Sequence, residues 1–158
     1  MSFVATTGAV LYLVAMAVVF GGTAALSFAV APTTFRTLKA VDAGRVFGRV
    51  LRVFDAMAWV ATLVAVAGGV AAMAVAISAR GAALVVLAAA VHATTTLLRR
   101  SVAPKMAALK PPETEDEART WDPDARRPFD ALHRLYVRLY TSNLFLSLAA
   151  LVLASLPG

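Results

Sequence analysis

Four long runs of apolar residues, separated by polar segments, dominate the pattern of the chain. They cover residues 1–35, 56–79, 81–98 and 139–158 and contain no charged residue. A helix needs roughly 20 mostly apolar residues to cross a bilayer, with a lower limit near 17. The runs are continuous and rich in Ala, Val and Leu, so they lack the alternation of a membrane β-strand. They predict an all-α membrane protein with four transmembrane helices, over about residues 10–29, 55–78, 82–98 and 136–156.

The order of apolar run, Val-Ala-Pro motif and polar segment occurs twice in the chain. Val102-Ala103-Pro104 closes the third run, and Val30-Ala31-Pro32 closes the first run 72 residues earlier. Each is followed by a polar segment with arginines, a phenylalanine and another apolar run. This predicts two helical hairpins of the same direction, a parallel repeat about an axis along the membrane normal. Because proline disfavours helical geometry in the residue before it, we expect Pro32 and Pro104 to mark helix ends or kinks.

The polar segment after Pro32 has helical spacing, with apolar residues on one side and basic residues on the other. It fits a helix lying at the membrane interface, or a long lead into the second span, with a turn at Asp42-Ala43-Gly44. A docking surface for an acidic partner is the alternative. The residues expected to contact lipid phosphates are Arg36, Lys39, Arg45, Arg49 and Arg52.

Residues 110–128 have the composition of a soluble segment, with three consecutive acidic positions and several prolines. This predicts a mobile cytoplasmic loop. Asp122 is suited to cap a helical turn, and Pro128 to begin the last helix, because proline is tolerated in a first turn.

The positions of the basic residues predict the orientation of the chain in the membrane. The chain of 158 residues is 60% hydrophobic and carries 15 Lys and Arg against 9 Asp and Glu. Five basic residues lie between the first two spans, one between the second and third, and nine around the third connection. The positive-inside rule then places the first and third connections in the cytoplasm and both termini outside. We therefore expect a multi-pass membrane protein, with lipid and not nucleic acid as its partner. High Ala, Val and Arg usage suggests a bacterial source and hence the inner membrane.

Small residues recur every four positions on two of the predicted helices. Ala17, Gly21, Ala25 and Ala29 form one such ladder, and Gly68, Ala72 and Ala76 form another. Small residues let helix backbones approach closely in lipid. These ladders predict packing seams and, as an alternative, the contact faces of a homo-oligomer.

Several polar residues interrupt the predicted spans, where they are costly and need a partner or a cavity. If the polar stripes of the helices face one another, they line a pocket open to the cytoplasm. The alternative is a set of interhelical hydrogen bonds worth about 0.6–2 kcal/mol each. For Asp55, an ion pair with Arg52 or Arg134 is expected, with a role in proton relay as the alternative. The candidate pocket residues are Asp55, His92, Thr96, His133, Tyr136, Tyr140 and Asn143.

The two histidines are the candidate metal or haem ligands. His92 precedes Arg99 by seven residues and so lies about 10 Å into the membrane, whereas His133 lies near the surface. This mismatch in depth disfavours a haem held by both. The chain has no cysteine, so a copper or zinc site would have to draw on Asp55 or a methionine. We predict no cofactor, with copper or haem as the alternative.

The motifs resemble those of a known family. Phe28-x-x-Ala31-Pro32-x-x-Phe35-x-x-Leu38, Val102-Ala103-Pro104 and Phe129-x-x-Leu132-His133 are similar to the domain of unknown function 4149, whose members resemble the eukaryotic transmembrane protein 205. Relatives often carry a serine three residues after the histidine and an asparagine seven after it, where this chain has Tyr136 and Tyr140.

The resemblance implies a four-span membrane protein with no established reaction. More remotely it implies a likeness to the copper-resistance D group, some of whose relatives handle copper or haem. The sequence contains no hydrolase triad, phosphate loop or dinucleotide motif. We therefore expect a non-enzymatic binding, structural or transport-related role, with handling of copper, haem or a small molecule as the alternative and a membrane oxidoreductase third.

Overall fold

The computed structural model describes residues 3–74, 78–109 and 111–156, and in these ranges it is helical without strands. This confirms the predicted fold class. The elements are α1 (Phe3–Ala25), the π-helix η1 (Leu26–Val30), α2 (Ala31–Thr37), α3 (Ala40–Met73), α4 (Ala79–Leu97), the π-helix η2 (Leu98–Val102), α5 (Ala103–Ala108), α6 (Glu115–Thr120) and α7 (Pro123–Ser155).

Four continuous helical stretches are long and apolar enough to cross a membrane, and they make this a multi-pass membrane protein. They contain 35, 34, 30 and 33 residues, more than the roughly 20 that a span needs. Large apolar side chains point outward on each of them, including Phe28, Val53, Val86 and Phe145, all more than 60% exposed. A surface of this kind is suited to lipid, since soluble monomers rarely expose large apolar patches.

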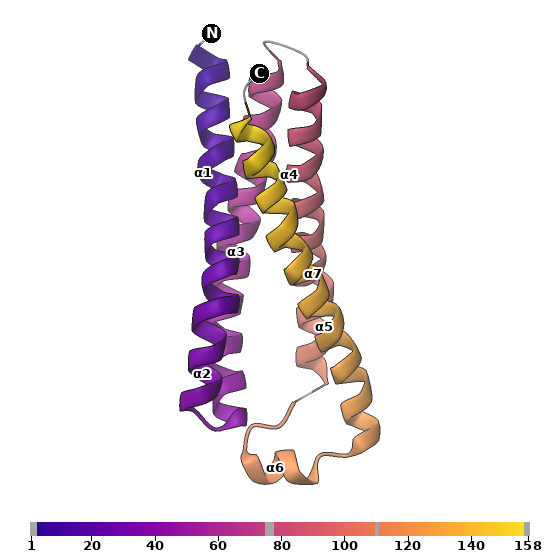
Figure 1. The fold of residues 1–158 in the computed structure, drawn as a ribbon. Coiled ribbons are helices and arrows are strands. Elements are labelled where there is room, and N and C mark those ends of the chain that lie inside the picture. The colour runs from indigo at the N-terminus through magenta and orange to yellow at the C-terminus, as the bar shows by residue number, and fades with distance from the viewer. Residues whose placement is uncertain (1–2, 75–77, 110, 157–158) are drawn as a thin grey trace.

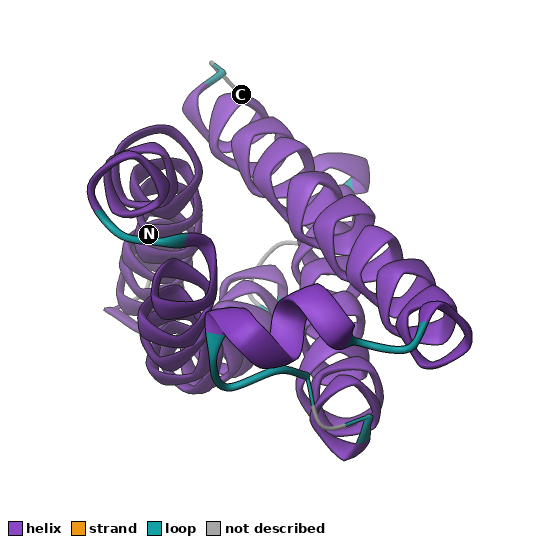
Figure 2. Cartoon of the chain, turned by 90° about the horizontal axis from the view of Figure 1, so that it is seen from below, coloured by secondary structure: helices purple, strands orange, loops and turns teal. Residues whose placement is uncertain are grey.

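The long helices pack as a closed ring in the order α1, α3, α4, α7, which leaves α1 diagonal to α4 and α3 diagonal to α7. The first turn of α1 and the last turn of α7 lie at the same end of the bundle (Figure 1). The opposite end, here called the basic end, carries α2, α5, α6 and the starts of α3 and α7. Seen from below, α6 lies in front of this end (Figure 2).

The two hairpins carry the same irregularity at the same place. Both π-helices end directly before an Ala-Pro pair, and Leu98 follows Leu26 at the 72-residue offset seen in the sequence. The same offset separates Tyr12 from Leu84, and the Tyr12 hydroxyl donates to the Leu84 carbonyl at 3.0 Å. Equivalent positions of a two-fold repeat meet only near its axis, so this contact places the pseudo-two-fold axis between α1 and α4.

Neither proline ends its helix, so of the two alternatives expected at Pro32 and Pro104 the helix end is wrong. The chain stays helical to Thr37 after the first and to Ala108 after the second. Proline lacks an N–H and its ring would clash with the carbonyl four residues earlier. The π-helix relieves this clash, because the amide of Ala31 bonds to Leu26 and that of Ala103 bonds to Leu98, five residues back in each case.

The membrane-embedded core is built from small residues that bring helices close together. Most of its fully buried members are Ala, with Tyr12, Met16, Val19 and Val91 between them. Gly8 and Gly68 bring two helix backbones close together, since a Cβ on Gly68 would lie 2.7 Å from the Gly8 carbonyl. The predicted seam on α3 therefore packs against α1 at Gly68, while Ala76 lies outside the described residues.

The connection between the first two spans is the long lead and not a separate interfacial helix. The chain turns at Leu38 and Lys39, so the turn expected at Asp42-Ala43-Gly44 is instead the first turn of α3. Residues 110–128 are likewise not one loop, because they include α6 and the start of α7. The Asp122 side chain caps α7 as predicted, but α7 begins at Pro123 and Pro128 lies inside it.

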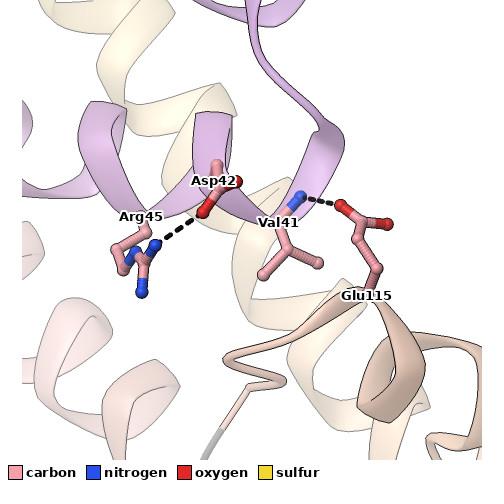
Figure 3. Close-up of polar contacts among 4 residues, drawn as sticks. All are labelled: Val41, Asp42, Arg45 and Glu115. Carbon is pink, nitrogen blue, oxygen red and sulfur yellow. Dashed lines mark hydrogen bonds and ion pairs between the residues drawn. The ribbon is translucent and has the colours of Figure 1, made fainter.

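Glu115 of α6 joins the second hairpin to the first. Its carboxylate accepts a hydrogen bond of 3.0 Å from the backbone N–H of Val41, in the first turn of α3 (Figure 3). The N-cap residue of α3, Lys39, supplies no side-chain cap of its own. A carboxylate at a helix N-terminus satisfies a free amide and interacts favourably with the helix dipole. The α5–α7 connection thus caps α3 from a distance.

Candidate functional site

Asp55 and Tyr136 form a buried polar pair across the diagonal of the bundle. Asp55 is 5% exposed on α3, and the Tyr136 hydroxyl of α7 donates to its Oδ2 at 2.7 Å. The ion pairs among the described residues join Arg45 to Asp42 and residues 126–127 to Asp130 and Asp124, so none includes Asp55. This corrects the expected pairing with Arg52 or Arg134.

The hydroxyl of Tyr140 is a second buried polar group beside this pair. The ring of Tyr140 stacks on Tyr136 with 6.0 Å between centroids and meets Phe54 edge-on at 6.3 Å. Thr23 is close enough to interact with its hydroxyl, but the hydroxyl oxygen is buried and makes no hydrogen bond to the described residues. A buried hydroxyl without a hydrogen-bond partner is energetically unfavourable.

His92 takes part in a polar cluster between α3 and α4. Its Nδ1 lies 2.9 Å from the Thr62 hydroxyl, which itself donates to the Trp59 carbonyl at 3.0 Å. A hydroxyl has one proton, so His92 Nδ1 is the donor to Thr62 when Thr62 donates to the Trp59 carbonyl, and the acceptor when Thr62 donates to His92. The Trp59 indole donates to Thr96 at 3.1 Å, and the Arg99 guanidinium lies 5.4 Å from the indole centroid. These contacts join His92 Nδ1 and the hydroxyls of Thr62 and Thr96 to Trp59 and to one another.

Asn143 joins α7 to α4. Its Oδ1 accepts from the Thr94 hydroxyl, and its Nδ2 donates to the Thr95 hydroxyl at 3.1 Å. One turn further along α7, the buried Ser147 hydroxyl donates to the Asn143 carbonyl at 2.6 Å. Both ends of the amide are therefore used, which is the arrangement expected of a helix-joining residue.

His133 lies apart from the other candidates. Its side chain is exposed near the basic end and stacks on Phe129, whose ring in turn meets Trp121. The structure does not bring His133 and His92 together. Within the described ranges, no group of three or more His, Cys, Asp or Glu side chains is placed to hold a metal ion.

The candidate residues are thus divided among separate contacts and do not surround one cavity. Two surface hollows lie on the lipid-facing side of α3, and none of the seven candidates lines either of them. The polar stripe of α7 nevertheless turns inward at three positions, where Tyr136, Asn143 and Ser147 are buried.

Three contacts lay outside the sequence-based candidates. Thr94 and Thr95 bind Asn143, although only Thr96 of this threonine run was a candidate. The sequence does indicate such a role for Thr94 and Thr95, since every hydroxyl in a span needs a hydrogen-bond partner. Arg80, considered only as a topology signal, donates to the Leu153 and Ala154 carbonyls and so caps α7. The Glu115 contact had no comparable signal, because it joins residues 74 positions apart.

The five residues expected to contact lipid phosphates are all exposed, and they lie on α2, on α3 and in the turn between them. Arg45 is the member paired with a carboxylate, that of Asp42 at 2.5 Å (Figure 3). The pair is about half exposed and local, so its effect on stability is small. The other four guanidinium and ammonium groups form no ion pair in the described part of the chain.

Comparison with known proteins rests on a family model. The model described as "Domain of unknown function (DUF4149)" matches residues 14–114, more than half of the chain. The chain belongs to this family. No curated protein and no solved structure matches it. The DUF4149 match covers both π-helices, Asp55 and His92, whereas Tyr136 and Asn143 of α7 lie beyond it.

Proposed function

We propose that this DUF4149 protein is a non-enzymatic, transport-related protein of the bacterial inner membrane in which Asp55 binds a proton between the two hairpins. The observation that carries the proposal is a buried carboxyl without an ion-pair partner among the described residues, held across the bundle by Tyr136. Acidic side chains inside membrane bundles are costly, and they commonly belong to proton relays or ion pathways.

The surroundings of Asp55 fit a group that changes its protonation. The positive charge of Arg99 acts on it from beyond ion-pair distance, and Tyr136 supplies one donor. An ionised carboxylate with one neutral donor is poorly stabilised in a low-dielectric interior. A protonated Asp55 needs an acceptor for its own proton. The Tyr140 hydroxyl makes no hydrogen bond to the described residues, and its ring stacks on that of Tyr136, the partner of Asp55. Because Asp55 and Tyr136 belong to different hairpins, a change in their bond would alter how the hairpins pack.

The proposed orientation puts the basic end in the cytoplasm. Fourteen of the fifteen Lys and Arg residues belong to the first and third connections or flank them, which supports this orientation through the positive-inside rule. Since the chain has no cysteine, single cysteines placed in the α2–α3 turn and at Ser78 can be labelled cleanly. We expect an impermeant maleimide to reach only the second of them from outside the cell.

The test of the proton site is infrared difference spectroscopy of the reconstituted protein over the pH range in which it stays folded. We expect a C=O stretching band of a protonated carboxylic acid that Asp55→Asn removes. Asp42→Asn, on the exposed surface of the same helix, should leave this band unchanged. Asparagine keeps an acceptor for Tyr136, so the variant should fold.

Proton movement is then measured in proteoliposomes that contain a pH-sensitive dye, under an imposed potassium diffusion potential. Proton entry should depend on Asp55 and remain in the Asp42→Asn control. If no carboxylic acid band responds to Asp55→Asn, Asp55 is a fixed interhelical hydrogen-bond acceptor and the proposal is wrong. The structure does not place the two histidines together, so they do not support the copper or haem alternative. This alternative stays a prediction.

A further inference from the structure

An apolar groove runs between the first helical stretch and α3 on the lipid-facing side of the bundle. It has a volume of about 450 Å³. Its lining is formed by Gly22, Ala25, Leu26, Val50, Val53, Phe54 and Met57. None of these side chains is charged, so the groove is suited to hydrocarbon.

The floor of the groove is formed by a glycine and an aromatic ring. A Cβ on Gly22 would lie only 2.1 Å from Cε2 of Phe54, so the ring of Phe54 rests against the glycine backbone. Four residues after Gly22, η1 begins at Leu26, which also lines the groove. Val53 and Met57 form the outer wall and are 64% and 55% exposed.

A positively charged end adjoins the groove. A second hollow, of about 600 Å³, shares Val53 and Met57 with the groove and is bordered by Arg49 and Arg52. Arg49, Val53 and Met57 follow one another at four-residue steps and therefore lie on one stripe of α3. Along this stripe the charged end lies toward the basic end of the bundle, about 12 Å from Met57 at 1.5 Å per residue.

Both arginines are available to an anion. Their side chains are exposed, and neither forms an ion pair with a carboxylate in the part of the chain that the structure describes. Guanidinium groups bind phosphate through paired, charge-assisted hydrogen bonds. A cationic site directly above an apolar groove matches a molecule with an anionic head and a hydrocarbon tail.

We propose that the two hollows together hold one anionic phospholipid, with its phosphate at Arg49 and Arg52 and an acyl chain over Val53 and Met57. This goes beyond the general contact of basic residues with lipid phosphates, because it assigns one lipid to one groove with a defined direction. A free phosphate would use only the arginines and leave the apolar groove without a role. The site is independent of the proton proposed at Asp55.

The test is native mass spectrometry of the full-length protein in mild detergent, titrated with phosphatidylglycerol or phosphatidylcholine. We expect one phosphatidylglycerol to be retained, and its binding to weaken roughly tenfold or more in Arg49→Gln/Arg52→Gln. The matched control, Arg36→Gln/Lys39→Gln, removes the same charge from the same end and should bind as the native protein does.

A second variant tests the groove without changing charge. Val53→Trp fills the shared wall of the two hollows and should weaken phosphatidylglycerol binding while both arginines remain. Equal loss in the Arg36/Lys39 control would show unspecific attraction to a basic surface and overturn the proposal. Unchanged binding in Val53→Trp, or displacement of the lipid by millimolar inorganic phosphate, would also overturn it.

Discussion

Asn143 shows how a single polar residue is held inside this bundle. Its amide receives a hydrogen bond from Thr94 and donates one to Thr95, so one side chain fixes the position of α7 against α4. The two threonines do not depend on it entirely. Thr95 also donates to the Val91 carbonyl at 2.7 Å, and Thr94 lies within hydrogen-bond distance of the Ala90 carbonyl. Removing Asn143 therefore leaves few polar atoms without a partner.

We predict that Asn143→Leu lowers the free energy of unfolding by about 0.6–2 kcal/mol, the range measured for interhelical hydrogen bonds in membranes. Leucine is similar in size, so the loss should come from the bonds and not from a cavity. The measurement is unfolding in mixed micelles with a denaturing detergent. Ser142→Ala is the control, because the exposed Ser142 hydroxyl bonds only to a carbonyl of its own helix. Equal effects in the two variants would contradict the prediction.

The side chains around Asp55 illustrate what residue types alone could and could not predict. The spacing of Tyr136, Tyr140 and Asn143 indicates an inward stripe on α7, because polar groups in a span must avoid lipid. It does not indicate which neighbouring helix each one meets. That choice depends on the rotation and tilt of α7, which are set by packing at many other positions. For the same reason a tyrosine, and not the expected arginine, is the partner of Asp55.

Among the elements, α6 is the one whose position the sequence predicted least. Its own formation is local, since the Thr114 hydroxyl accepts from the Glu117 amide and the Glu117 carboxylate accepts from the Glu113 amide. Together these bonds resemble a capping box. A helix of this length is marginal alone, so its contact with α3 through Glu115 decides where it lies.

We predict that Glu115→Ala loosens the first turn of α3. The Val41 amide loses its acceptor, and the loss of a helix cap costs about 0.5–2 kcal/mol. A loss of 1 kcal/mol raises local opening about fivefold. Hydrogen–deuterium exchange of the peptide over residues 38–48 measures this directly.

Glu113→Ala is the matched control for the α6 contact, because it removes the same charge from the same connection and its carboxylate is not bonded to α3. Exchange at the start of α3 should stay as in the native protein. If both variants accelerate exchange alike, the effect is a general loss of negative charge beside the basic end. In that case Glu115 would not act as a cap.

The π-helices are a second feature of the helical elements that the sequence predicts only in part. The repeated Ala-Pro pairs are visible in the sequence, and η1 and η2 lie at equivalent positions of the predicted repeat. The sequence does not decide whether the helix ends or kinks at the residue before each proline. The helices continue because the i to i−5 bond keeps the backbone satisfied, as lipid requires, while making room for the proline ring.

At the scale of the whole molecule, the fold class follows from few features of the sequence. Four apolar runs without charges leave helices as the natural way to satisfy the backbone, and the short connection around Arg80 makes the second and third spans antiparallel neighbours. The ring order and the diagonal contacts need information about helix faces. The ladder on α1 shows why, because four-residue spacing is equally compatible with an internal seam and an external one.

The ladder on α1 is in fact external, and this supports its role in self-association. Its members Ala17, Gly21 and Ala25 on α1, and Ala29 on η1, are exposed, and a Cβ on Gly21 would meet nothing within 4 Å. We predict that the protein forms a homo-oligomer through this face. Gly21→Leu should then shift the molecule toward the monomer, measured by single-molecule photobleaching or Förster transfer in liposomes, without lowering the free energy of unfolding.

Gly68→Leu is the matched contrast, because its side chain must displace the Gly8 backbone, whose carbonyl lies 2.7 Å from the position of a Cβ on Gly68. This variant should lower the free energy of unfolding of a single chain by about 1–3 kcal/mol or more. An oligomer that survives Gly21→Leu would assign the contact to another face.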